Sequence, residues 1–398
     1  MFRQTADGAT VTRKPSCGNL SGTGGAVNRE TGWSPLAAGL APRGYGVPHA
    51  AHAALDRTGA WGETEATLKH AFYLALLACL FLVGDTGCSG SSSPDIVVYC
   101  SVNEQYASQI FADFEAQTGI SVAVQYDIES AKSVGLSAKL EAERQYPHAD
   151  VWWGSEAFLS ARLAEEGILD RYVPPDSADI APQYKDPGGF WTGVGLRARV
   201  IAVSFPPPPV PIRGLWDLTD PRLKDKIAMS RPTAGETGAH IAALYTCWGI
   251  PKARSFFEKL HDNGIILLGG NAEVADQVGA GTYAAGITDS DSITNALANG
   301  GKLTMVVPDQ DAGGTLAMPT TVALVKGGPH EEEAKKLIDF LVSRQTEQKL
   351  IQMQFAKWSV RSGPKAIKCL PVNYQTAATI YPLAQQEASA ILDDRMAE

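Results

Sequence analysis

Residues 95–124 read DIVVYCSVNEQYASQIFADFEAQTGISVAV. The apolar run from Ile96 to Tyr99 is typical of a strand that is covered on both faces. Ser101 and Glu104 stand three residues apart, which is the spacing of a capping box at a helix start. Apolar residues then recur at helical spacing until Gly119, a residue type that commonly ends helices. The stretch therefore predicts a strand, a helix and a second strand.

The loop after the first strand is the first candidate site. In open α/β sheets, ligands bind beyond the carboxyl ends of the strands, where loops and helix N-termini converge. Residues 100–103 occupy that position, and they offer the side chains of Ser101 and Asn103.

Further along the chain, short strands alternate with helices, and polar residues follow several of the strands. WWGSE follows one strand and supplies Trp153, Ser155 and Glu156; we expect one tryptophan of the pair in the core and Trp153 in a cleft. A long strand-like segment at 190–205 carries Arg197 and Arg199, which share a face because they stand two apart. Its length suits a strand that crosses between two lobes.

Two more polar clusters lie in the second half of the sequence. A helix expected at 238–248 begins with Thr237 and Gly238, where hydroxyls and free backbone N–H groups favour an anion. TDSD at 288–291 marks a change from strand to helix. Such a cluster commonly caps a helix, but its two carboxylates can also face a cation.

Composition excludes several classes of function. A net charge of −9 gives no electrostatic support for nucleic-acid binding. Six cysteines without a CxxC pair indicate neither a zinc ribbon nor a disulfide scaffold. The sequence lacks nucleophile-elbow, zinc-protease and P-loop motifs, so we expect no enzyme and no catalytic residue or cofactor. An adhesive surface lipoprotein is a further rival, yet it would not need polar loops at strand ends.

The first 88 residues differ in character from the rest. Residues 1–67 have no sustained period, which suggests a disordered or untranslated segment. Residues 68–88 place thirteen apolar residues after Lys69 and His70, which suits a signal peptide better than a membrane span. Cys88, followed by a Ser-rich tether at 89–94, is similar to a bacterial lipoprotein cleavage site, although Asp85 departs from that pattern.

From Asp95 to about Arg361 the chain resembles the iron(III)-type periplasmic solute-binding proteins of ABC transporters. The order of VYCSVNEQYASQIFADFEAQTGI, PHADVWWGSEAFL, FWTGVGLRARVIAV, LWDLTDPRLKDKIA, GITDSD and PTTVALVKGGPHEEEAKKLIDFLVS carries the resemblance. It implies an α/β, two-lobe type II periplasmic-binding-protein fold with hinge-crossing strands, a monomer, and an ABC permease of the inner membrane as partner. The expected division is 95–195 as lobe 1, 196–307 as lobe 2, 308–345 as a return to lobe 1, and 346–398 as a C-terminal helical segment on lobe 2 or the hinge.

The resemblance also implies ligand positions. Ferric-binding members have a histidine where this chain has Asn103, a glutamate beside Ser155, and a tyrosine pair where it has Ser290 and Asp291. Their synergistic anion corresponds to a helix start at 237–239, with an asparagine near Asn271. The histidine and both tyrosines are missing here.

What remains is a set of oxygen ligands suited to a hard cation or an ammonium group. We expect Fe(III) or another metal, held with a phosphate- or carbonate-like anion; an organic phosphate or phosphonate and a cationic solute such as a polyamine or thiamine are the alternatives. The expected metal ligands are Glu156, Asp289 and Asp291, and the expected ligand- or anion-binding residues are Ser101, Asn103, Trp153, Ser155, Arg197, Arg199, Thr237, Gly238, Ala239, Asn271, Thr288 and Ser290.

Overall fold

The computed structural model describes residues 94–127, 133–233 and 235–393. The expected leader, with its signal peptide at 68–88 and Cys88, lies outside these residues. The strands are β1 (Ile96–Cys100), β2 (Val122–Tyr126), β3 (Val151–Gly154), β4 (Leu169–Asp170), β5 (Thr192–Ser204), β6 (Ile227–Ser230), β7 (Ile266–Leu268), β8 (Ala285–Asp289), β9 (Leu303–Val306) and β10 (Ala317–Val325). The helices are α2 (Glu104–Thr118), α3 (Val134–Ala142), α4 (Ala157–Glu165), α5 (Gly235–Trp248), α6 (Ile250–Asp262), α7 (Asn271–Gly279), α8 (Ser290–Ala298), α9 (Glu331–Val342), α10 (Arg344–Gln352) and α11 (Tyr374–Asp393), with short 3₁₀ turns at Pro175–Ser177, Pro182–Tyr184, Leu215–Thr219 and Pro221–Leu223.

The strand–helix–strand unit expected at 95–124 is present. β1 and β2 pair in parallel from Ile96 opposite Val122 onward, and the apolar face of α2 is buried. Gly119 ends α2 in the left-handed conformation, with φ of 71°. The capping box was wrong, because Asn103 and not Ser101 occupies the cap position; the hydroxyl of Ser101 bonds to a different loop.

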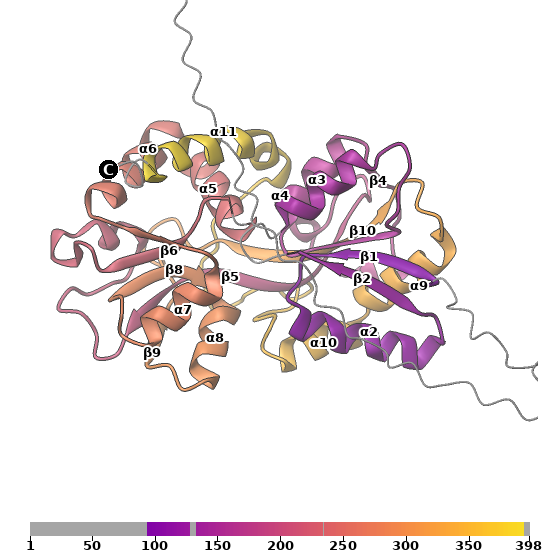
Figure 1. The fold of residues 1–398 in the computed structure, drawn as a ribbon, viewed down its shortest axis with the longest axis horizontal. Helices are drawn as coiled ribbons and strands as arrows, with labels where there is room; N and C mark the ends of the chain where they lie inside the picture. Colours follow the sequence, from indigo (N-terminus) through magenta and orange to yellow (C-terminus); the bar gives the residue numbers. More distant parts are fainter. Residues whose placement is uncertain (1–93, 128–132, 234, 394–398) are drawn as a thin grey trace, which may run out of the picture. The chain divides into compact units, whose positions relative to one another are not determined.

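One strand connects the two halves of the sheet. The strand order is β2-β1-β3-β10-β5-β8-β6-β7, with β4 beside β10 and β9 beside β5. The first part of β5, residues 192–198, pairs with β10, and residues 199–204 pair with β8 and β9. All thirteen residues of β5 are buried. The strand therefore changes partners between Arg197 and Arg199, as the expected crossing strand requires (Figure 1).

Helices cover both halves, and one helix contacts both. α2 and α9 lie on the half built from β1 to β3, and α7 and α8 pack on β5 and β8 in the other half. α11 packs on α4 of the first half and on α5 and α6 of the second (Figure 1). α10 packs on α9 and β5. Nowhere in 94–127, 133–233 and 235–393 is there a helix long and apolar enough to cross a membrane.

Candidate functional site

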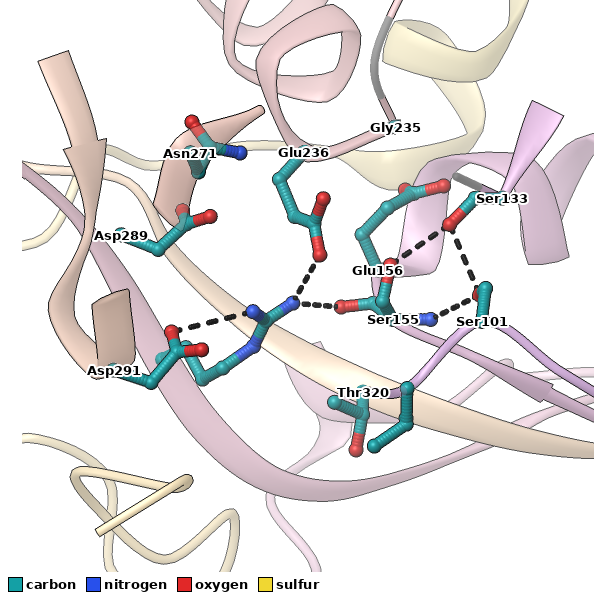
Figure 2. A network of polar contacts seen from close by, with 12 residues as sticks. Ser101, Ser133, Ser155, Glu156, Gly235, Glu236, Asn271, Asp289, Asp291 and Thr320 are labelled. Atoms are coloured by element: carbon teal, nitrogen blue, oxygen red, sulfur yellow. Dashed lines mark hydrogen bonds and ion pairs between the residues drawn. The ribbon is translucent and has the colours of Figure 1, made fainter. Parts of the chain in front are cut away.

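Polar side chains from both halves meet around β5, next to the carboxyl ends of the parallel strands. Ser155 follows β3, Asp289 ends β8, and Glu236 lies in the first turn of α5. Figure 2 shows these residues facing a common region, with Asn271 and Asp291 beside them. We expected ligand-binding residues to follow the carboxyl ends of strands, which we call the strand-end rule. The fold brings such residues together although they are more than 130 positions apart in the sequence.

Arg197 ties together three segments. Its Nη2 atom donates to the backbone oxygen of Ser155 at 2.6 Å and to Oε1 of Glu236 at 2.8 Å. Its Nη1 atom lies 3.3 Å from Oδ1 of Asp291. Burial lowers the pKa of Arg197, but Asp291 and Glu236 outweigh burial and raise it above the ordinary value. The guanidinium therefore stays charged and holds a loop of one half against two helices of the other.

Arg199 makes a second ion pair one step along the strand. Its Nη1 atom lies 2.8 Å from Oδ1 of Asp289, the residue directly opposite it on β8, and 2.9 Å from Oδ1 of Asn271. Its Nη2 atom reaches the hydroxyl of Thr237 at 3.5 Å. Burial raises the pKa of Asp289 to about 6, although Arg199 opposes this shift. Thr288 donates to the backbone oxygen of Asn271 at 2.6 Å and so fixes the start of α7.

Three serine hydroxyls form a separate, uncharged group. Ser133 lies 3.0 Å from Ser101 and 2.8 Å from Ser155, measured between hydroxyl oxygens. The backbone N–H of Ser155 donates to the hydroxyl of Ser101 at 2.9 Å. All three are buried, and Figure 2 shows the hydrogen bonds that join them. We call Ser101, Ser133 and Ser155 the hydroxyl side of the site, and Glu236, Asp289 and Asp291 the acidic side.

Glu156 does not join the acidic side. Its carboxylate caps α4 by accepting hydrogen bonds from the backbone N–H groups of Phe158 and Leu159. Burial raises its pKa to about 8, while these two bonds oppose the shift. The expected metal set of Glu156, Asp289 and Asp291 is thus divided among different partners. Within the described ranges, no three His, Cys, Asp or Glu side chains are grouped so that they could hold a metal ion.

Other expected site residues lie close by in different roles. Trp153 is fully buried and packs edge-to-face on Phe111, with ring centroids 5.3 Å apart, so it belongs to the core and not to a cleft. Asn103 begins α2 and lines a pocket of about 320 Å³ with Ser101 and Tyr126. Ser290 accepts a hydrogen bond from the backbone N–H of Ala198 at 3.2 Å and so joins α8 to the crossing strand.

The helix whose N-terminus was expected to bind an anion begins earlier than the sequence suggested. α5 starts at Gly235, so Thr237, Gly238 and Ala239 lie within its first turns and not ahead of it. A Cβ atom at Gly238 would lie 2.3 Å from the hydroxyl of Tyr381, which explains why a glycine stands there. Thr237 shares a hydrogen bond with the hydroxyl of Ser230 at the end of β6.

Sequence reasoning missed Glu236 and Ser133. Both follow parallel strands, as the residues that it found do, and this position was the available signal. Glu236 is an acid in the first turn of a helix, a common place for a solvated charge, and only the fold reveals that Arg197 lies against it. Ser133 directly precedes α3.

Among the residues that the structure describes, carboxylates outnumber guanidinium groups around β5. The two guanidinium groups of Arg197 and Arg199 face three carboxylates, those of Glu236, Asp289 and Asp291. Two other titratable groups near them do not change this count at neutral pH. Glu156 keeps its proton because its pKa is about 8. The pKa of His240, on α5, is held well below the ordinary value by burial and by Arg199. The described part of the site therefore has more carboxylates than guanidinium groups, beside uncharged hydroxyls.

Two α/β halves joined by crossing strands, with a polar site between their strand ends, define a ligand-trapping protein of the type II class. The family comparison gives the same answer. Residues 96–355 match the model of the bacterial extracellular solute-binding proteins, and the chain belongs to that family. It is therefore a solute-binding protein of the ABC-transporter type, and its family consists of binding proteins.

Individual relatives are distant but cover most of the chain. Iron uptake protein A1 of Synechocystis sp. is 26% identical over 298 residues, which are 71% of this chain and 79% of that protein. A putative 2-aminoethylphosphonate-binding periplasmic protein of Salmonella typhimurium is 23% identical over 64% of this chain and 73% of its own. Among solved structures, the ferric binding protein from Campylobacter jejuni has a TM-score of 0.65 at 20% identity and covers 75% of this chain and 98% of its own.

Proposed function

We propose that this protein captures a small solute carrying a positive charge together with an anionic group, and delivers it to an ABC permease in the inner membrane. Ferric iron held with a small anion is the first candidate. A zwitterionic organic phosphonate is the second. Both bring the two kinds of charge for which the site has complementary groups.

Three buried carboxylates beside neutral hydroxyl donors are the observation that carries this proposal. Carboxylates that are buried close together repel one another, and a cation lowers that cost. Serine and threonine hydroxyls and the N–H groups of a helix start are donors that suit an anion. Ligands with a cation alone would leave the hydroxyl side unused.

Iron is supported by the relatives named for iron uptake and ferric binding. The same acidic side would have to supply hard oxygen ligands, which requires Arg197 or Arg199 to release a carboxylate. No tyrosine pair stands at 290–291. We therefore expect iron-loaded protein to lack the visible band of iron–tyrosinate bonds, and an absorption scan of that protein tests this.

The phosphonate candidate rests on a separate observation, the absence of a three-residue metal cluster among the residues that the structure describes. An ammonium group needs one carboxylate and not three, and a phosphonate suits hydroxyls and helix N–H groups. The relative named for 2-aminoethylphosphonate supports this second candidate.

The lobe boundaries and the mode of export belong to the same proposal. Arg197, Arg199 and the acidic side are buried, so a ligand reaches them only when the lobes at 95–195 and 196–307 separate about β5 and β10. Residues 68–88 act as the signal peptide, and Cys88 carries a lipid anchor if cleavage is of the lipoprotein type. We expect a monomer whose radius of gyration falls when ligand binds.

Native mass spectrometry and elemental analysis of protein purified without added ligand test the proposal. Thermal shift with ferric citrate, 2-aminoethylphosphonate and a neutral hexose then ranks the candidates, because a ligand of the folded state raises Tm. A charged ligand that raises Tm supports the proposal. Retention of an uncharged sugar without metal overturns it.

A further inference from the structure

One hydrogen bond connects the two halves directly, away from the ion pairs of β5. The hydroxyl of Tyr106, in the first turn of α2, donates to Oδ1 of Asn295 on α8 at 2.8 Å. α2 belongs to the half built on β1 and β2, and α8 packs on β5 and β8. In Figure 1 these two helices lie on the opposite side of the crossing strands from α11, which contacts both halves.

Tyr106 also contacts the arginine site through one aromatic ring. Its ring packs on Phe355, with centroids 4.8 Å apart, and the guanidinium carbon of Arg197 lies 5.0 Å from the centroid of that same ring. A cation over an aromatic face is attracted by the ring quadrupole. Phe355 thus contacts both the phenol ring that joins the halves and the guanidinium that binds the acidic side.

The segment that carries Phe355 is fixed to the crossing strand. Leu196 donates to the backbone oxygen of Trp358 at 2.8 Å and accepts from Lys357 at 2.7 Å. Gly195 has a φ of 69°, and a Cβ atom there would lie 2.7 Å from that of Ala356. The backbone next to Phe355 is therefore held against β5, and the buried ring contacts both Tyr106 and Arg197, so a displacement of Tyr106 acts on Arg197 through that ring.

We propose that Tyr106 is a positioning residue that joins the two lobes when they close and, through Phe355, sets the orientation of Arg197. This inference rests on the proposed solute-trapping function. The phenol is buried and its pKa is raised, first by burial and then by the charge of Asp291. It therefore keeps its proton and remains a donor. Closure and the arrangement of the acidic side are coupled through this contact.

The first test measures the distance between the lobes. Spin labels at the exposed positions Ser108→Cys on α2 and Ala298→Cys on α8, in a chain whose other cysteines are replaced, report it by pulsed electron resonance. Tyr106→Phe and Asn295→Ala should each at least double the population at longer distances. The double variant should show no more than either single change, because both remove the same bond.

Tyr172→Phe is the matched control. Its hydroxyl also donates to one side-chain oxygen at 2.8 Å, that of Asp339, but both residues belong to the same half. It should leave the distances unchanged. Distances that are the same in wild type and Tyr106→Phe, with and without each probe, overturn the inference.

The second test measures dissociation of ferric citrate and of 2-aminoethylphosphonate. Tyr106→Phe should raise the dissociation rate about two- to tenfold, the range expected for loss of one hydrogen bond, and leave the association rate nearly unchanged. Phe355→Leu should raise the dissociation rate while leaving the distances as in wild type, since it acts after closure. Altered distances in Tyr106→Phe without binding of either probe refute the proposed ligands and support the contact between lobes. Tight binding of a probe by Tyr106→Phe, with distances and dissociation rates as in wild type, supports the proposed ligands and refutes the contact between lobes.

Discussion

The hydroxyl side and the acidic side of the site occupy equivalent strand-end positions in the two halves, but they are built from opposite chemistry. Ser101, Ser133 and Ser155 bond mainly to one another and carry no charge. The acidic side is held by ion pairs to β5, where three carboxylates of the described residues face two guanidinium groups. Buried charges cost far more to leave unpaired than hydroxyls do. The acidic side should therefore govern stability and pH response, and the hydroxyl side should adjust affinity.

The largest loss of stability should come from removing the positive charge of Arg197, which pairs with the acidic side. Arg197→Met removes the guanidinium group that pairs with both Glu236 and Asp291, and we expect a loss of about 3–5 kcal/mol in the free energy of unfolding. Urea denaturation at pH 7 measures it. Arg231→Met is the control, because its ion pair with Asp393 is 3.4 Å long and more than a third exposed on each side, so it should cost under about 1 kcal/mol. Equal losses in the two variants would contradict the contrast drawn between the sides.

A pH effect separates Glu156 from the acidic side. Its pKa is raised from 4.5 to about 8 by burial, so the folded protein holds a proton that the unfolded chain has released between these values. Stability contributed by that proton is present below about pH 4.5 and is lost as pH rises toward 8. The free energy of unfolding of Glu156→Gln, measured relative to that of wild type, should be about 2–4 kcal/mol higher at pH 9 than at pH 4.5. Parallel unfolding curves for the two proteins across this range would show that Glu156 titrates normally.

The surplus of carboxylates among the described residues predicts which substitution spares the fold and impairs binding. Asp291→Asn removes one of three carboxylates while Arg197 keeps Glu236 and the Ser155 oxygen. We expect unfolding free energy within about 1 kcal/mol of wild type and affinity for a cationic probe weakened about 10- to 100-fold. Calorimetric titration with ferric citrate and 2-aminoethylphosphonate measures the affinity. Asp220→Asn, which breaks an exposed pair with Arg222, should not change it. Normal binding by Asp291→Asn would exclude this carboxylate from the site.

Much of the fold follows from the sequence because its signals are local. The apolar run at 96–99, the helical spacing of α2 and the stop at Gly119 each act over a few residues. The long crossing strand was visible as an unbroken strand-like run, and its two arginines share a face for a simple geometric reason. The strand-end rule then located most of the polar residues around it.

The partners within the site were not visible, because they depend on juxtapositions between distant segments. Glu236 and Asp291 look like ordinary first-turn acids until Arg197 is placed between them. Glu156 looks like a metal ligand, but it serves the helix that follows it. Trp153 alternates with Trp152 along a strand that is buried on both faces, so strand periodicity alone could not assign either ring to a cleft.

The smallest effect should come from the hydroxyl side, and Ser133 tests it with least disturbance. Its φ of 67° is unfavourable for serine and alanine alike but not for glycine. Ser133→Ala and Ser133→Gly both remove the hydroxyl between Ser101 and Ser155, so each should weaken probe binding by about two- to tenfold. The glycine variant should also be the more stable of the two by up to about 1 kcal/mol, because it relieves the backbone. Ser137→Ala is the control for affinity, because it removes a buried hydroxyl that donates to the backbone oxygen of Val134 within its own helix. If the alanine and glycine variants differ in affinity, or if Ser137→Ala weakens binding equally, backbone conformation and not the hydroxyl sets the contribution of this side.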